Sequence, residues 1–129
     1  MNESPSMKIL VTGASGFIGS FIVEEALRRG METWAAVRPS SSRRYLADPR
    51  IHFISLDFSS QKNIEEALAD HHFDYVVHAA GLTKSLHPED FYEVNTEGTK
   101  RLVKALLNLQ MPIHKFVYLS SLSVFGAIK

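Results

Sequence analysis

Three glycines, Gly13, Gly16 and Gly19, are spaced three residues apart and follow directly on the short apolar run 9–11. A helical pattern begins at the same place, so the glycines occupy a strand-to-helix turn. In such a turn the first glycine permits a tight bend, the second lets the backbone approach a pyrophosphate, and the third lets the helix pack closely on the strand. Uncovered N–H groups of the first helical turn supply donors for the anion. The spacing predicts a dinucleotide-phosphate site, with a purely structural turn as the alternative.

Alternating strand and helix patterns must position this turn. The expected strands cover 8–11, 32–37, 51–56, 73–78 and 114–120, and the expected helices cover 17–29, 61–70 and 89–109. Such alternation predicts an α/β fold, a Rossmann-type doubly wound parallel sheet of about five strands. We expect residues 7–129 to form the nucleotide-binding domain and residues 1–6 to be a flexible N-terminus.

Apolar spacing indicates which helix faces are buried. The expected buried positions are Ile18, Phe21, Ile22 and Ala26 in the first helix, and Phe91, Val94, Leu102, Val103, Leu106 and Leu109 in the long helix. Gly30 is expected to end the first helix. Gly98, inside the long helix, predicts a close approach to the sheet or to a ligand, because a mid-helix glycine is otherwise unfavourable. The fifth strand is expected to be buried.

Composition narrows the class of protein. The chain carries 14 Lys and Arg against 14 Asp and Glu and no cysteine, so neither nucleic acid nor a membrane surface is expected as a partner, and disulfides are excluded. No apolar run approaches the ~20 residues of a spanning helix. The first six residues lack the pattern of a signal peptide, which predicts a cytoplasmic protein. The six histidines show no metal-ligand spacing, so no metal is expected.

Five motifs, in order, resemble the extended short-chain dehydrogenases/reductases, the group that includes nucleotide-sugar epimerases and dehydratases and dihydroflavonol-type reductases. The motifs are the glycine turn 12–19, Asp57, the run 78–81, the run 95–99 and the run 118–126. They cover nearly the whole chain.

The resemblance implies roles for individual residues. Those that would surround the pyrophosphate are Gly13, Ser15, Gly16, Phe17, Ile18 and Gly19. Asp57 and Phe58 would contact the adenine edge, and Ala79, Ala80 and Gly81 would line the path from ribose to nicotinamide. Asn95 would hold the long helix to the loop after the fourth strand. Ser121 would be the catalytic residue that hydrogen-bonds the reacting oxygen of the substrate.

Each of these roles has a structural alternative. Asp57 would equally cap the turn that holds Ser59 and Ser60. Asn95 would be harmless on an exposed helix face, although its poor helix propensity suggests a hydrogen-bonding task. Ser121 and its neighbours would satisfy backbone groups at a strand end. His78, at the end of a buried strand, is expected to be a hydrogen-bonded core residue.

The cofactor is indicated at the end of the second strand. A site for NAD expects a carboxylate ~20 residues after the glycines, and this chain has Val37, Arg38 and Pro39 there. A guanidinium suits the 2′-phosphate of NADP, with donors from the following serines and arginines. The resemblance agrees, since its reductase branch with Val-Arg at this place tends to use NADPH. NADP is therefore preferred, NAD is the alternative, and a solvated basic loop that binds nothing stays open.

The chain departs from the family in its proton-transfer pair. None of its four tyrosines is followed four residues later by a lysine, whereas hydride transfer to a carbonyl needs an acid for the developing alkoxide. We therefore expect the N-terminal, cofactor-binding part of a longer enzyme, truncated before the substrate domain and inactive alone, with apolar surface beside its fifth strand. The parent would act on a nucleotide sugar or a carbonyl compound. A non-catalytic NADP-sensing or scaffold module is the alternative function, and a homodimer stays open.

Overall fold

The computed structural model describes residues 7–14, 17–37, 46–79 and 88–118, without the side chains of Phe17 and of 88–96. In chain order the elements are β1 (Lys8–Thr12), α1 (Phe17–Arg28), β2 (Glu32–Val37), β3 (His52–Ser55), α2 (Gln61–Leu68), β4 (Tyr75–His78), α3 (Pro88–Asn108) and β5 (Lys115–Tyr118). Every expected element is present, within a few residues of its predicted ends. The expected N-terminal tail, 1–6, lies outside the described residues.

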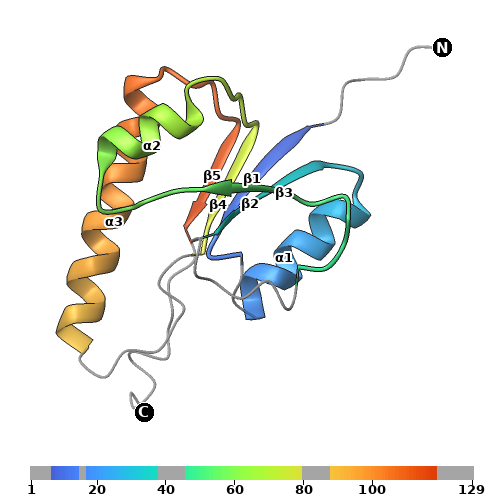
Figure 1. Ribbon diagram of the computed structural model, residues 1–129, viewed down its shortest axis with the longest axis horizontal. Helices are drawn as coiled ribbons and strands as arrows, with labels where there is room; N and C mark the ends of the chain where they lie inside the picture. The colour runs from blue at the N-terminus through green and yellow to red at the C-terminus, as the bar shows by residue number, and fades with distance from the viewer. Residues whose placement is uncertain (1–6, 15–16, 38–45, 80–87, 119–129) are drawn as a thin grey trace.

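The strands form one parallel sheet in the order β3-β2-β1-β4-β5. Helix α1 covers one face, while α2 and α3 lie together on the other (Figure 1). The doubly wound α/β prediction is therefore confirmed. The chain winds outward in opposite directions from β1 and β4, and the crevice at the carboxyl ends of two such strands is the usual ligand site of this fold.

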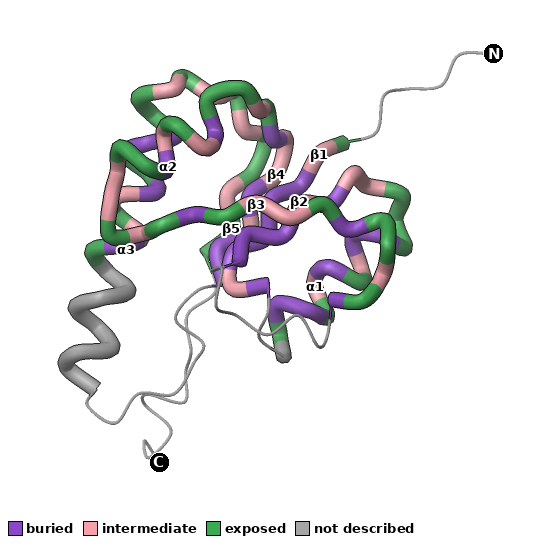
Figure 2. Tube along the Cα trace, in the orientation of Figure 1, coloured by how far each residue is buried: buried purple, intermediate pink, exposed green. Residues whose placement is uncertain are grey.

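Side chains of β1 alternate between the two halves of the core. Ile9 and Val11 pack with Val23 and Leu27 of α1, whereas Leu10 packs with residues of α2 and α3. All three side chains are buried because a central parallel strand is covered on both faces. Figure 2 shows this buried strip along the middle of the sheet.

The buried face of α1 differs from the predicted one. Ile18 and Phe21 are 49% and 55% exposed, and the buried face instead carries Gly19, Val23 and Leu27. Helix α1 crosses the turn after β1 so closely that only a glycine fits, and Gly19 must therefore face inward. Residues four and eight positions later share that face, which turns Ile18 and Phe21 outward. Ile22 is half-buried, and Ala26 is buried as predicted.

Two further burial predictions need correction. In α3, Leu102 and Leu106 are buried as predicted, and Ala105 is buried with them. Val103 is exposed instead of buried. Strand β5 is largely exposed rather than buried. Among the described residues it pairs only with β4, at the edge of the sheet, and Tyr118 is 45% exposed. Phe91 and Val94 belong to the part of α3 whose side chains are not described.

Two further glycines, Gly30 and Gly98, lie at positions where the sequence predicts a special backbone role. Gly30 ends α1 with φ 80° and donates its N–H to the carbonyl of Leu27 at 3.0 Å, as expected for a helix-ending glycine. Gly98 lies against the loop after β3, where an added Cβ would stand 3.3 Å from the Cβ of Phe58. A close approach at Gly98 is therefore present, but the neighbour is Phe58 of this loop and not the sheet or a ligand as predicted. None of the helices in the described part of the chain is long and apolar enough to cross a membrane.

Buried His78 joins three elements at the carboxyl end of the sheet. Its Nδ1 lies 2.6 Å from Oγ1 of Thr12 at the end of β1, and its Nε2 lies 2.9 Å from Oγ1 of Thr99 in α3. Each hydroxyl can donate or accept, so both ring nitrogens are satisfied in either tautomer. Burial lowers the pKa of His78 from 6.5 to about 4, so the ring is neutral near pH 7. This confirms the hydrogen-bonded core residue predicted from the sequence.

Leu102→Ala should lower the free energy of unfolding by about 2–5 kcal/mol, because it leaves a cavity in the core between α3 and the sheet. Leu107→Ala is the matched control on the same helix, since Leu107 is 69% exposed, and it should change stability by less than about 0.5 kcal/mol. Urea denaturation at pH 7 measures both values. Equal losses would contradict the orientation of α3.

His78 should make the protein sensitive to mild acid. Its pKa is about 4 in the folded chain against 6.5 when unfolded, so the unfolded state binds more protons between these values and stability falls as the pH drops through this range. The contribution of neutral His78 to the free energy of unfolding is fully present above pH 6.5. Urea denaturation of wild type and of His78→Gln at several pH values tests this, because effects of other groups cancel in the difference. That difference should shrink as the pH falls from 6.5 towards 4, and a constant difference would contradict the assignment.

Candidate cofactor-binding site

The turn after β1 has the backbone geometry that its glycines predict. Gly13 adopts φ 66°, in the left-handed region that only glycine enters without strain. A Cβ added at Gly19 would stand 2.1 Å from the carbonyl oxygen of Gly13, which no side chain tolerates. The roles of Gly13 in the bend and of Gly19 in close packing are thus both visible. Ser15 and Gly16 lie outside the described residues, so the pyrophosphate contact at Gly16 stays a prediction.

The first turn of α1 is suited to an anion. It begins at Phe17, directly after the glycine turn, and contains no acidic residue. The first N–H groups of a helix have no partner within the helix itself, and here they and the positive dipole end meet no carboxylate within the turn. Ile18 is half-exposed at this end of the helix, which keeps it available to a bound ligand. The side chain of Phe17 is not described.

The end of β4 is tied to the end of β1. The N–H of Ala79 donates to both oxygens of Thr12, at 3.2 Å to the carbonyl and 3.1 Å to Oγ1. Thr12 and His78 are also paired in the sheet register. Ala79 is consequently held beside the start of the glycine turn, as its expected place in the site requires. Ala80 and Gly81 lie outside the described residues.

The loop after β3 brings Asp57 and Phe58 to the same end of the sheet. Asp57 is exposed, and its Oδ1 accepts from the N–H and the hydroxyl of Ser59, at 2.9 and 2.5 Å. The turn-capping alternative for Asp57 is therefore present in the structure, while its adenine contact stays a prediction. Phe58 is partly buried against the α2/α3 side of the core, and its ring lies 5.5 Å from that of His78.

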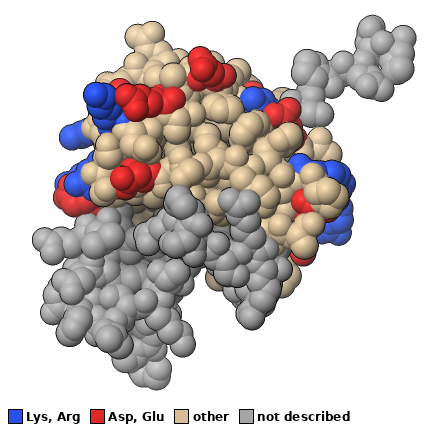
Figure 3. Space-filling view, in the orientation of Figure 1, with Lys and Arg blue, Asp and Glu red and all other residues tan. Residues whose placement is uncertain are grey.

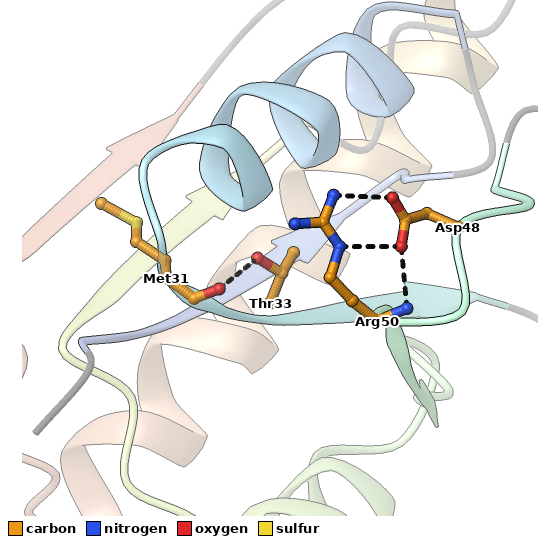
Figure 4. A network of polar contacts seen from close by, with 4 residues as sticks. All are labelled: Met31, Thr33, Asp48 and Arg50. Carbon is orange, nitrogen blue, oxygen red and sulfur yellow. Dashed lines mark hydrogen bonds and ion pairs between the residues drawn. The ribbon is translucent and has the colours of Figure 1, made fainter.

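One arginine of the loop after β2 already has a partner. The guanidinium of Arg50 donates two hydrogen bonds to the carboxylate of Asp48, of 3.0 and 2.8 Å, and the backbone N–H of Arg50 donates a third at 2.8 Å (Figure 4). These bonds lower the pKa of Asp48 to about 2 and close the turn that leads into β3. Arg38, the residue predicted to bind the 2′-phosphate, lies outside the described residues.

The remaining predicted residues are only partly placed. Asn95 lies in α3, but its side chain is not described, and Ser121 lies beyond the described residues. Sequence reasoning missed Thr12, Thr99 and Arg101, whose side chains join the loops around the site. Thr12 precedes the first glycine and Thr99 closes the run 95–99, so both were visible in motifs. Their shared partner, His78, required the register between β1 and β4.

Any attraction for an anion at this site must be local. On the face shown in Figure 3, acidic and basic side chains are interspersed over the described residues, without a field of one sign. Within the same described part of the chain, no three His, Asp or Glu side chains are grouped closely enough to hold a metal ion. Backbone donors at the start of α1 are therefore the principal anion-binding groups that the described structure offers.

Comparison with known proteins agrees with this geometry. The sequence profile of the "NAD dependent epimerase/dehydratase family" matches residues 9–129. A UDP-glucose 4-epimerase of Klebsiella pneumoniae is 33% identical over 131 residues, which cover 93% of both chains. A decarboxylating sterol-4-alpha-carboxylate 3-dehydrogenase of Candida albicans is 32% identical over 131 residues, which cover 96% of this chain and 37% of that enzyme.

A solved structure shows the same arrangement. The UDP-glucose 4-epimerase of Thermus thermophilus in complex with NAD has a TM-score of 0.66 and 29% identity, over 81% of this chain and 35% of the solved chain. The present chain thus spans little more than a third of the Thermus and Candida enzymes, and it matches their N-terminal part. On the profile match and on the glycine turn between β1 and α1, the chain belongs to the NAD-dependent epimerase/dehydratase family.

Proposed function

We propose that this chain is the NADP-binding part of an epimerase, dehydratase or reductase that acts by hydride transfer at a carbinol or carbonyl carbon. The observation that carries the proposal is the crossing of α1 over the carbonyl of Gly13, which places the N-terminus of α1 at the carboxyl ends of β1 and β4. That position is where dinucleotides bind in doubly wound sheets. The names of the relatives, epimerases and a dehydrogenase, support the same class of reaction.

The described residues fit a dinucleotide cofactor. Gly13 and Gly19 keep Cβ atoms out of the turn, and the first turn of α1 offers N–H donors without an acidic neighbour. When bound, the nicotinamide ring accepts or returns a hydride. Ala79 would line the nicotinamide side, and Asp57 and Phe58 would lie at the adenine. Ser121 would hydrogen-bond the reacting oxygen of the substrate, either a nucleotide sugar or a carbonyl compound.

NADP is the preferred cofactor because of the residues after β2. The family description and the Thermus complex name NAD, so the preference depends on this chain's own sequence. No carboxylate stands at Val37–Pro39 to bind the two ribose hydroxyls, and Arg38 offers a planar guanidinium instead. Arg50 is not a candidate for this role, since Asp48 holds its guanidinium.

Calorimetric titration should show tighter binding of NADP than of NAD. Arg38→Ala should weaken NADP binding by about 10-fold or more, the value of a charge-assisted hydrogen bond of ~1.5–3 kcal/mol, and should leave NAD binding nearly unchanged. Arg50→Ala is the matched control, expected to leave both affinities as they are because Arg50 is paired with Asp48. Equal affinities of the wild type for NAD and NADP would refute the preference.

This 129-residue chain should bind cofactor without turning over substrate. It contains no Tyr-x-x-x-Lys sequence to protonate the developing alkoxide. The measurement is NADPH oxidation at 340 nm with carbonyl compounds and nucleotide sugars, on a sample whose NADPH binding has been confirmed by calorimetry. Steady-state oxidation by the chain alone would contradict the proposal.

A second candidate is a non-catalytic NADP-sensing or scaffold module on the same fold. Such a module needs the cofactor cradle but neither Ser121 nor a Tyr-x-x-x-Lys pair. The parent reading frame distinguishes the two: a Tyr-x-x-x-Lys sequence downstream of Ser121 favours the enzyme, and its absence favours the sensor.

A further inference from the structure

One turn of α3, residues 98–101, contacts the loop that follows β3 and the last residue of β4. Gly98 and Arg101 reach the loop after β3, and Thr99 reaches the end of β4 through His78. The residues in these contacts are 21 to 43 positions apart in the sequence. Only the fold brings them together. The loop after β3 lies at the predicted adenine side of the cofactor site, and the end of β4 lies at the predicted nicotinamide side.

The loop after β3 is held at Phe58 by two kinds of contact. Arg101 donates from Nη1 to the backbone carbonyl of Phe58 at 3.1 Å, in partly buried surroundings. Gly98 has no side chain, and this leaves just enough room for the Cβ of Phe58. A Cβ added at Gly98 would stand 3.3 Å from that atom. A hydrogen bond from a charged donor and a close backbone approach together determine how far this loop stands from α3.

The end of β4 is held through a chain of three hydrogen bonds. Thr99 Oγ1 lies 2.9 Å from Nε2 of His78, whose Nδ1 lies 2.6 Å from Oγ1 of Thr12. Thr12 Oγ1 also accepts from the N–H of Ala79 at 3.1 Å. Thr12 and His78 are buried, and Thr99 is partly buried, so this chain of hydrogen bonds connects α3 to Ala79 through the interior of the protein.

We propose that the turn 98–101 of α3 is a positioning element that holds the two sides of the cofactor site, each through its own contacts. Arg101 and Gly98 set the adenine side through Phe58, and Thr99 sets the nicotinamide side through His78 and Ala79. These residues act through others and do not themselves touch the cofactor. The inference rests on the proposed cofactor binding.

Titrations with AMP and with NADP separate the two sides, because AMP occupies only the adenine side. Arg101→Met should weaken both AMP and NADP by about 10-fold, the value of one hydrogen bond from a charged donor. Thr99→Val should weaken NADP by several-fold, as expected for one neutral hydrogen bond, and leave AMP binding unchanged. Thr99→Ser, which keeps the hydroxyl, should restore NADP binding.

Lys104→Met is the matched control for Arg101→Met, since Lys104 is an exposed cation one turn further along α3. It should bind both ligands as wild type does. If Arg101→Met does not fold, Gly98→Ala provides the second variant for the adenine side, with the same expected loss of AMP affinity. Circular dichroism at the titration temperature checks that each variant is folded.

The outcomes distinguish this inference from the function on which it rests. Failure of the folded wild type to bind NADP and AMP would overturn both. Wild-type binding together with unchanged affinities of Arg101→Met and Thr99→Val would overturn only the positioning role of α3. Equal losses of AMP affinity in Arg101→Met and Thr99→Val would also overturn it, because the two sides would then not be set separately.

Discussion

The close approach of α1 to the backbone of the turn after β1 is the constraint on which the rest of the structure depends. An added Cβ at Gly19 would stand 2.1 Å from the carbonyl oxygen of Gly13, so only glycine permits the crossing. The crossing aims the first turn of α1 at the carboxyl edge of the sheet, where an anion gains N–H donors. It also determines which side of α1 is buried, and thereby the half of the core that α1 shares with β1 and β2.

The opposite face of the sheet supports the site in a different way. There α3 supplies Leu102 and Leu106 to the core and, one turn earlier, contacts Phe58 through Gly98 and Arg101 and His78 through Thr99. His78 connects the two roles, because it is buried in the sheet and hydrogen-bonded to both β1 and α3. The same helix thus packs in the core and satisfies a buried polar group.

Sequence periodicity predicted the elements well and their surroundings less well. The strands were recognised because short apolar runs bounded by turn residues are typical of a parallel sheet. Ile18 and Phe21 were assigned to the wrong face, since an apolar count ignores that the glycine must face inward. Strand β5 was predicted to be buried, yet apolar residues alone do not reveal whether a second strand or a helix covers an edge. Gly13 and Gly19 have the backbone geometry that their spacing predicts, while the cofactor contacts of these glycines and of Ala79 stay predictions.

By itself, the sequence determined the fold class and the glycine turn, because each is a local pattern of residue types at short spacing. Tertiary structure decided that Thr12, His78 and Thr99 form one network. The members of that network are 66 and 21 residues apart. Contacts at such separations depend on strand register and helix rotation, which the packing of the whole sheet sets and no local pattern encodes.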